Sequence, residues 1–421
     1  MTDEAVSEGV PEPIHDDELS HAIEIALPRE LQRYTRNATR WRVGCEVQVL
    51  RDGGETYPAM LAAIAGAQRS ICLETYILAS DRTGGKFGAA LIERARSGVT
   101  VRLIYDAVGS FGLAGAFVDE LRAAGIHVIE FNPIAPWRAR GAFSHRDHRK
   151  VLVVDDEVAF TGGLNIADDY AAAADGGAGW HDMHCRVRGP IVLDLARLFR
   201  RTWLRIGGAP YPAPAPASRA PGVAPHHGAD DAGQPRAIGT SFARAIDNTA
   251  RRKKPAIRRA YLHVIKHARE SVWLQNAYFM PDRGLRRALV HAVQRGVDVR
   301  VIVPGHSDIR LIEWASLYVM RRLAARGVKI LRWRGAMMHA KTAVVDAVWS
   351  TIGSYNLDAQ SRFNNLEVTV EILDPAVGAA MVAEFEGELA GCEPFDESDW
   401  LKQPWWRKAL AWLAYRFRRW L

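Results

Sequence analysis

The sequence predicts an α/β protein in which one folding unit occurs twice. Its 421 residues, 48% of them hydrophobic, are enough for two cores and too apolar for a disordered chain. Short apolar strands alternate with helical segments, and the alternation is repeated in the second half of the chain. Each copy also carries the same polar motif at the same place. The expected fold class is therefore a duplicated α/β/α sandwich, with two largely parallel sheets covered by helices on both faces.

The repeat rests on a matching series of elements in the two halves. In each half a strand-like run precedes a helical segment, and a second and a third strand follow. These segments are expected at 70–77, 87–95, 98–104 and 126–131 in the first half, and at 271–279, 285–294, 296–302 and 329–333 in the second.

The chain divides into five segments by composition. Residues 1–28 are acidic and aperiodic and are expected to form a tail, and residues 29–206 form the first α/β domain. Residues 207–236 alternate Pro and Ala, which supply neither ladder donors nor a helix interior, and we expect an exposed linker there. The second domain covers 237–392, and 393–421 form a separate carboxyl-terminal element.

Charge and cysteine content limit the possible binding partners and the cellular compartment. The net charge of +7 suits nucleic acid, anionic lipid or a phosphorylated small molecule equally well. Cys45, Cys72, Cys185 and Cys392 lie far apart without a Cys-x-x-Cys pair, which argues against structural zinc and for a reducing compartment. No apolar stretch approaches the roughly 20 residues that span a bilayer, and the amino terminus is acidic, unlike a signal peptide. A cytoplasmic protein is expected.

Each half carries one polar motif with the same spacing. The motif reads His-x-Lys-x-x-x-x-Asp, followed seven residues later by Gly, a small residue, any residue and Asn. Such a pattern is rare by composition alone, and two copies in register are not chance. The motif residues are His148, Lys150, Asp155, Gly162, Gly163 and Asn165 in the first half, and His339, Lys341, Asp346, Gly353, Ser354 and Asn356 in the second.

The pattern indicates a phosphate site with a built-in nucleophile. Side chains alternate along a strand, so a His and a Lys two residues apart point the same way. An ammonium beside an imidazole depresses the imidazole pKa unless an anion lies between them, and a phosphate supplies that anion. Backbone N–H groups at the glycine turn, with the two asparagines, are further candidate ligands of the phosphate oxygens.

The motif carboxylates divide into two groups. Asp155 and Asp346 belong to the catalytic motif, but by parity they point away from the His/Lys face, which favours a structural role at the strand end. Asp182 and Glu367 each follow a histidine on the next strand and are better candidates to orient the imidazoles. Whether they pair within one half or across the halves is open.

Over residues of about 40 to 390 these motifs resemble the phospholipase D superfamily, and within it the bacterial cardiolipin synthases without transmembrane helices. The chain departs from the usual pattern at Gly163, where Ser is common, and at Tyr355, where a small residue is common. The short sequence segments that support this resemblance are Glu74-Thr-Tyr76, Asp106-Ala-Val-Gly-Ser110, Trp180-His-Asp182, Asn276-Ala-Tyr278 and Gly353-Ser-Tyr-Asn-Leu-Asp358.

The resemblance implies two phospholipase D-like halves related by a pseudo-twofold axis, with the active site between them. His148 and His339 would flank one phosphodiester, one attacking phosphorus to form a phosphohistidine and the other protonating the leaving alcohol. Family habit favours His148 as the nucleophile. Lys150, Lys341 and the two asparagines would stabilise charge on the phosphate. No cofactor and no metal is implied.

The implied activity is that of a cardiolipin synthase, a phosphatidyltransferase. It would move a phosphatidyl group from a phospholipid donor, phosphatidylglycerol or phosphatidylethanolamine, to the hydroxyl of phosphatidylglycerol. A phospholipase D that hydrolyses phospholipids to phosphatidic acid is the alternative. Nucleases of the superfamily generally carry one motif per chain, and tyrosyl-DNA phosphodiesterases lack the motif aspartate, so no nucleic-acid partner is expected.

The carboxyl-terminal segment predicts a basic, tryptophan-rich amphipathic helix after Pro404. Its composition fits a helix that lies on an anionic membrane surface, which would bind the protein peripherally to the inner membrane. The alternative is that its apolar stripe packs on the second domain. The expected membrane contacts are Trp405, Trp406, Arg407, Lys408, Trp412, Arg416, Arg418, Arg419 and Trp420.

Overall fold

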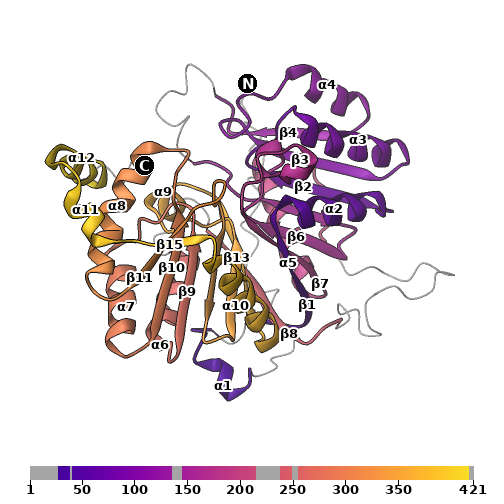
Figure 1. Ribbon diagram of the computed structural model, residues 1–421. Coiled ribbons are helices and arrows are strands. Elements are labelled where there is room, and N and C mark those ends of the chain that lie inside the picture. Colours follow the sequence, from indigo (N-terminus) through magenta and orange to yellow (C-terminus); the bar gives the residue numbers. More distant parts are fainter. Residues whose placement is uncertain (1–26, 38–39, 135–144, 215–237, 249–254, 417–421) are drawn as a thin grey trace, which may run out of the picture.

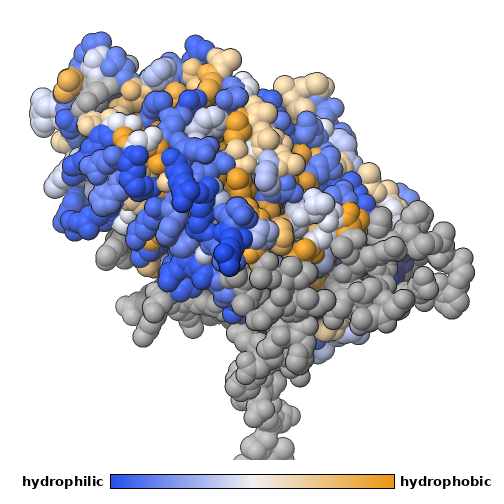
Figure 2. Space-filling view, turned by 90° about the horizontal axis from the view of Figure 1, so that it is seen from below, coloured by the Kyte–Doolittle hydropathy of each residue, from blue (hydrophilic) through white to orange (hydrophobic). Residues whose placement is uncertain are grey.

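The structure is a computed structural model that describes residues 27–37, 40–134, 145–214, 238–248 and 255–416. It has the mixed α/β architecture that the sequence predicts. The two halves lie side by side, and strands of both belong to one sheet (Figure 1). Seen from below, the molecule presents a broad hydrophilic area that adjoins smaller apolar groups (Figure 2).

The strands of the two halves are arranged in the same order. The first half has β1 (Arg42–Arg51), β2 (Ser70–Thr75), β3 (Thr100–Asp106), β4 (His127–Phe131), β5 (Val151–Val154), β6 (Val158–Gly162) and β7 (Met183–Arg188). The second half has β8 (Ser241–Asn248), β9 (Ser271–Asn276), β10 (Asp298–Pro304), β11 (Lys329–Trp333), β12 (Lys341–Val345), β13 (Trp349–Gly353), β14 (Glu367–Leu373) and β15 (Cys392–Pro394).

This arrangement confirms the duplication. The first half runs β4-β3-β2-β5-β6-β7-β1 across the sheet, and the second runs β11-β10-β9-β12-β13-β14-β8. Antiparallel pairing of β1 with β8 joins the halves at the middle of the sheet. The β2–β3–β4 and β9–β10–β11 groups are parallel, whereas the motif strands β5 and β12 run antiparallel to β2 and β9. Each half is therefore a mixed sheet.

Helices cover both faces of the sheet, as expected for the predicted sandwich. On one face, α5 and α10 belong to a core shared by both halves, and on the other α2 to α4 and α6 to α8 cover the separate cores. No helix in the described part of the chain combines the length and apolar character needed to cross a membrane. The helices are α1 (Arg29–Gln32), α2 (Asp52–Ala65), α3 (Arg82–Arg96), α4 (Gly115–Ala123), α5 (Ile191–Arg205), α6 (Ala256–His267), α7 (Arg283–Gln294), α8 (Arg310–Ala324), α9 (Ala359–Phe363), α10 (Pro375–Leu389), α11 (Glu397–Lys402) and α12 (Trp405–Arg416).

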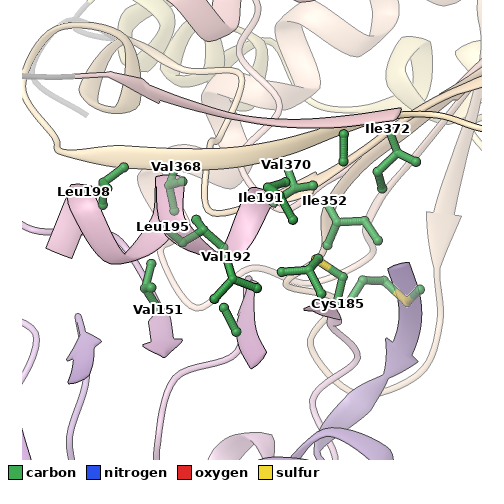
Figure 3. Close-up of a cluster of buried hydrophobic side chains, with 14 of the residues drawn as sticks. Val151, Cys185, Ile191, Val192, Leu195, Leu198, Ile352, Val368, Val370 and Ile372 are labelled. Atoms are coloured by element: carbon green, nitrogen blue, oxygen red, sulfur yellow. The ribbon is translucent and has the colours of Figure 1, made fainter. Parts of the chain in front are cut away.

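The shared core locks the halves together. Side chains from β5, β7 and α5 of the first half meet side chains from β13 and β14 of the second (Figure 3). Fully burying one such Val, Leu or Ile contributes about 1.5–3 kcal/mol. Because this cluster draws on both halves, neither half completes its core without the other. Its members include Val151, Cys185, Ile191, Val192, Leu195, Leu198, Ile352, Val368, Val370 and Ile372.

Asp155 and Asp346 hold turns at the strand ends remote from the motif histidines. Asp155 directly follows β5, and its carboxylate accepts the three backbone N–H groups of residues 68–70 at 2.7 to 2.8 Å. Asp346 follows β12 and accepts the backbone N–H groups of residues 269–271 in the same way. These turns begin β2 and β9. These contacts fit the structural role favoured by strand parity, and a catalytic role of the two aspartates stays a prediction.

Two segment boundaries differ from those expected. Leu27, Tyr34 and Trp41, assigned to the tail and the first domain, pack in the core of the second half, where the Tyr34 hydroxyl donates to Asp346 at 3.0 Å. Apolar side chains in this segment cover the base of the second sheet. At the other end, β15 is an edge strand paired with β11, so the second domain extends past residue 392.

The linker expected over 207–236 begins with ordered contacts. The guanidinium of Arg102 lies 3.8 Å from the centre of the Tyr211 ring, which fixes this part on the first half. Residues 215–236 of the linker and 1–26 of the expected tail lie outside the described residues.

Replacing Asp155 by Ala should lower the free energy of unfolding by about 2–4 kcal/mol, because three backbone N–H groups lose their acceptor. The turnover number of the folded variant should stay close to that of wild type, since the carboxylate is remote from the histidines. Urea unfolding followed by circular dichroism measures the first quantity. A large loss of turnover with unchanged stability would support the catalytic assignment.

Candidate active site

The backbones of the two halves pair where the motif histidines lie. The His148 N–H donates to the Leu366 carbonyl at 3.0 Å, and the His339 N–H donates to the His181 carbonyl at 2.6 Å. Each acceptor immediately precedes the carboxylate expected to orient an imidazole. The folding of one half thus fixes the histidine of the other.

The imidazole–carboxylate pairs cross between the halves. Nδ1 of His148 lies 3.1 Å from Oε2 of Glu367, and Nδ1 of His339 lies 2.7 Å from Oδ2 of Asp182. All four side chains are buried. A carboxylate at Nδ1 holds the ring proton there and leaves the Nε2 lone pair for chemistry. The two predicted orienting residues are therefore in place, and the open question of their pairing is answered.

The two motif lysines lie in the same site. Lys150 Nζ donates to the carbonyl of His148 at 2.7 Å, and Lys341 donates to the carbonyl of His339. Burial, together with the charge of Lys341, lowers the pKa of Lys150 to about 7, and burial lowers the pKa of Lys341 to about 8. The two ammonium groups repel one another in a dry site. An anionic phosphodiester between them would relieve this repulsion.

The imidazoles are held neutral. Burial and the charge of Lys150 lower the pKa of His148, although Glu367 opposes the shift. Burial and the charge of Lys341 lower the pKa of His339 to about 3, although Asp182 opposes it. A neutral imidazole with its proton on Nδ1 is the form that attacks phosphorus. A bound phosphate anion would offset the lysine charges and make protonation of one ring easier.

The three glycines and the serine that were expected to bind substrate make close contacts within the protein. Added Cβ atoms at Gly162 and Gly353 would lie 2.5 Å from Cα of His184 and 2.3 Å from Oγ1 of Thr369, so these glycines let neighbouring strands approach. At Gly163 a Cβ would lie 2.1 Å from an Asp182 carboxylate oxygen. The Ser354 hydroxyl donates to Glu367. These four residues pack against the orienting carboxylates and the neighbouring strands, and their contact with substrate stays a prediction.

The two asparagines differ. Asn165 is bound inside the first half, where its Oδ1 accepts the Ile77 N–H at 3.0 Å and its Nδ2 donates to the Tyr170 hydroxyl at 2.7 Å. Asn165 is thus bonded within the fold, and its contact with phosphate stays a prediction. Asn356 is buried, and its Oδ1 has no hydrogen-bond partner among the described residues. Its contact with phosphate stays a prediction.

Aromatic rings that the sequence did not assign to the site surround the histidines. The Tyr76 ring centre lies 5.0 Å from that of His148, and the Tyr170 and Tyr278 ring centres lie 5.4 and 6.2 Å from that of His339. Tyr76 and Tyr278 each follow the carboxyl end of a parallel strand, β2 or β9. A tyrosine one or two residues after each of these matching strands was the available signal.

His181 is a second site residue that the sequence did not assign. Its Nδ1 and Nε2 lie 2.7 Å from Asp52 and 2.8 Å from Glu388, carboxylates of different halves. Burial lowers its pKa, but the hydrogen bonds to both carboxylates outweigh this and raise the pKa to about 10. His181 is thus a charged link between the halves beside Asp182. Within the described residues, no group of three or more His, Cys, Asp or Glu is arranged to hold a metal ion.

Comparison with known proteins agrees with this geometry. A family model described as the PLD-like domain of cardiolipin synthase matches residues 60–203 and 261–389. The chain is 34% identical over 385 residues to cardiolipin synthase B of Salmonella typhi, covering 90% of this chain and 89% of that protein. It is 32% identical over 359 residues to a cardiolipin synthase of Geobacillus sp. (strain WCH70), covering 85% and 69%.

A solved structure supports the fold. The phosphatidylserine synthase of Haemophilus influenzae Rd KW20 superposes with a TM-score of 0.68 at 12% identity, over 90% of this chain and 95% of that one. Fold and site together define a protein with two phospholipase D-like domains. The chain belongs to the cardiolipin synthase family, and the predicted enzyme class, a phosphatidyltransferase, is confirmed.

Asp182→Asn and Glu367→Gln should each lower the turnover number by about a hundredfold to ten-thousandfold, because an amide favours the wrong imidazole tautomer. The Michaelis constant should change little, since the two lysines remain. Ser361→Ala serves as a control, because Ser361 donates to Glu367 at 2.6 Å and its loss should have a smaller effect. An effect confined to the Michaelis constant would place the carboxylates in a headgroup pocket.

Proposed function

We propose that this protein transfers a phosphatidyl group from a phospholipid donor to the terminal hydroxyl of phosphatidylglycerol through a phosphohistidine intermediate. The observation that carries the proposal is the crossed pairing, which gives one buried site two oriented imidazoles and two ammonium groups. A hydrolase would use the same two imidazoles with water in place of the acceptor hydroxyl, so it is the family membership that favours transfer. The relatives' printed names and the family model support the same reaction.

In the first step His148 is the nucleophile. Its Nε2 lone pair attacks phosphorus in line with the leaving alcohol, and a P–N bond forms as the P–O bond to that alcohol breaks. His339, which takes up a proton once the phosphodiester anion offsets the lysine charges, gives that proton to the departing oxygen. Lys150 and Lys341 stabilise the charge that builds on the equatorial phosphate oxygens.

In the second step the acceptor enters. Neutral His339 takes the proton of the phosphatidylglycerol hydroxyl, whose oxygen attacks phosphorus, and the P–N bond to His148 breaks. The products are cardiolipin and glycerol when phosphatidylglycerol is also the donor, or cardiolipin and ethanolamine when phosphatidylethanolamine is the donor. Atoms and protons balance, and His339 is again protonated for the next cycle.

The assignment of roles rests on the two carboxylates. The His339–Asp182 pair, at 2.7 Å, is shorter than the His148–Glu367 pair, at 3.1 Å. A short bond to an ionised carboxylate stabilises an imidazolium, which the general acid must become. Lys341 and His339 lower the pKa of Asp182 against the effect of its burial, so this carboxylate stays ionised. This supports His339 as the acid and base.

We also propose that the protein works at the cytoplasmic face of the cell membrane, bound peripherally. Its proposed substrates are bilayer lipids. Its four cysteines are all unpaired, as in a reducing compartment.

The reaction is tested by incubating the purified protein with phosphatidylglycerol labelled in its headgroup, with and without phosphatidylethanolamine. Cardiolipin and free glycerol are the expected products. Phosphatidic acid as the main product would mean that water is the acceptor and that the protein is a hydrolase. Ethanolamine release that depends on added phosphatidylethanolamine would identify this lipid as a second donor.

The histidine roles are separated with a donor whose leaving group needs no acid, phosphatidyl-p-nitrophenol. His339→Ala should release one equivalent of p-nitrophenol in a burst and accumulate acid-labile phosphoprotein on His148, because the first step survives and the second lacks its base. His148→Ala should give no burst. A burst from His148→Ala alone would reverse the two roles.

A further inference from the structure

The exposed large apolar side chains are gathered on one face. The carboxyl ends of the parallel strands point to the active site, because Tyr76 and Tyr278 follow β2 and β9 there. Phe111 follows β3, Ile309 and Leu311 follow β10, and Phe363 ends α9, four residues before Glu367 at the start of β14. All other exposed large apolar residues of the described chain are on the loop after β4 or on α11 and α12: Ile134, Leu401, Trp405, Trp406, Leu410, Trp412 and Leu413.

The helix α12 is docked through its small residues. Ala411 and Ala414 are buried, and Ala414 packs with Met280, Ile312 and Ala315. The Tyr415 ring lies 4.8 Å from that of Tyr318 on α8. One side of the helix therefore packs on the second half, beside α8 in Figure 1, as the packing alternative predicts. The membrane interpretation concerns the other side.

The opposite side of α12 is left open. Trp405 is 80% exposed and Trp412 is 50% exposed, and Trp406, Leu410 and Leu413 are exposed as well. Trp406 and Leu410 also line a groove with Trp314 and Leu317 of α8, so the uncovered side of the helix is that of Trp405, Trp412 and Leu413. Arg418, Arg419 and Trp420, expected to take part in it, lie outside the described residues.

The docked end of α12 reaches the catalytic site. Tyr278, whose ring lies 6.2 Å from that of His339, also packs against the cluster that contains Ala414. The exposed tryptophans are therefore carried on a helix anchored beside the entrance to the site. In the first half, Phe111 follows Ser110, which donates to the Tyr76 carbonyl at 3.1 Å, and Phe111 is 82% exposed.

Cations accompany the apolar side chains. A groove of about 350 Å³ between α7 and α8 is lined by arginines and by no carboxylate. Arg286 in this groove donates to the Tyr415 hydroxyl, which places the groove next to α12. Among the described residues, none of its arginines forms an ion pair with an acid. The groove arginines are Arg283, Arg286, Arg287, Arg322 and Arg326, and α12 adds Arg407, Lys408 and Arg416.

We propose that the exposed side of α12, together with Leu311, Phe363 and Phe111 around the entrance, is a docking surface for an anionic lipid bilayer. This inference rests on the proposed function, because a phospholipid must travel from a bilayer into a buried site. Aromatic side chains enter the headgroup boundary, and the neighbouring cations pair with anionic headgroups. The surface places the active-site entrance against the membrane, so that a headgroup reaches the histidines without leaving the bilayer.

The test uses point substitutions, because removing α12 would uncover Met280, Ile312 and Ala315. Wild type should sediment with vesicles of phosphatidylglycerol at low salt, and less with vesicles of phosphatidylcholine alone. Trp405→Ser/Trp412→Ser should bind phosphatidylglycerol vesicles at least tenfold more weakly, since two interfacial anchors are lost. The matched variant Trp405→Phe/Trp412→Phe keeps apolar rings and should retain most binding. Lys329→Ser, at the far end of β11, is a charge control that should bind like wild type.

A second readout separates this surface from the chemistry. With short-chain, water-soluble phosphatidylglycerol, the serine double variant should turn over like wild type, while its rate on vesicles falls in parallel with binding. Unchanged vesicle binding by the double variant would overturn the docking surface, and a change of the variant from dimer to monomer in sedimentation would assign it to a second copy of the chain. If wild type binds vesicles through these residues but makes no cardiolipin from the soluble substrate, the proposed function fails and the surface stands.

Discussion

The crossed hydrogen bonds between each histidine and a carboxylate of the other half are the constraint on which the site depends. Neither half contains both a motif histidine and the carboxylate that orients it, because Glu367 is hydrogen-bonded to His148 and Asp182 to His339. The shared core, the β1–β8 pairing and the charged His181 link all hold the halves in the one relation that forms both pairs. Catalysis therefore depends on packing far from the phosphate, since a small shift of one half would misalign both rings at once.

The electrostatics of the site follow from this enclosure. Two lysines, two carboxylates and two imidazoles lie together out of water, and burial lowers the pKa of both lysines. With both imidazoles neutral, the two ammonium groups and the two carboxylates already balance, so an entering phosphodiester adds one negative charge that a protonated imidazole can offset. A phosphodiester supplies one negative charge between the two ammonium groups. This charge also lowers the free energy of protonating a buried imidazole. Substrate binding and preparation of the acid are then one electrostatic event.

The sequence predicted the duplicated fold, the two His-x-Lys pairs and the two orienting carboxylates because these follow from local spacing. Strand parity also separated Asp155 and Asp346 from the site. The crossed pairing did not follow, because it depends on how the halves dock, and no local pattern encodes this. The sequence does not separate contacts of the glycines, Ser354 and Asn165 with phosphate from contacts within the protein, because a Gly–Asn turn looks the same in both cases. His181 was missed because its partners, Asp52 and Glu388, lie 129 and 207 residues away.

The departures from perfect duplication show how the two copies compensate. In the first half the short Asp182 approaches His339, and Gly163 leaves room for its carboxylate, since even a Cβ there would lie 2.1 Å from an Asp182 oxygen. In the second half the orienting acid is Glu367, which has one more methylene, and Ser354 occupies the equivalent position and donates to it. A glycine with an aspartate and a serine with a glutamate are thus two solutions for placing one oxygen at Nδ1. The first half has Gly163 in place of the usual serine because the Asp182 carboxylate occupies the space of a side chain there. Exchanging only one member of either pair would therefore misplace the carboxylate that the opposite histidine needs.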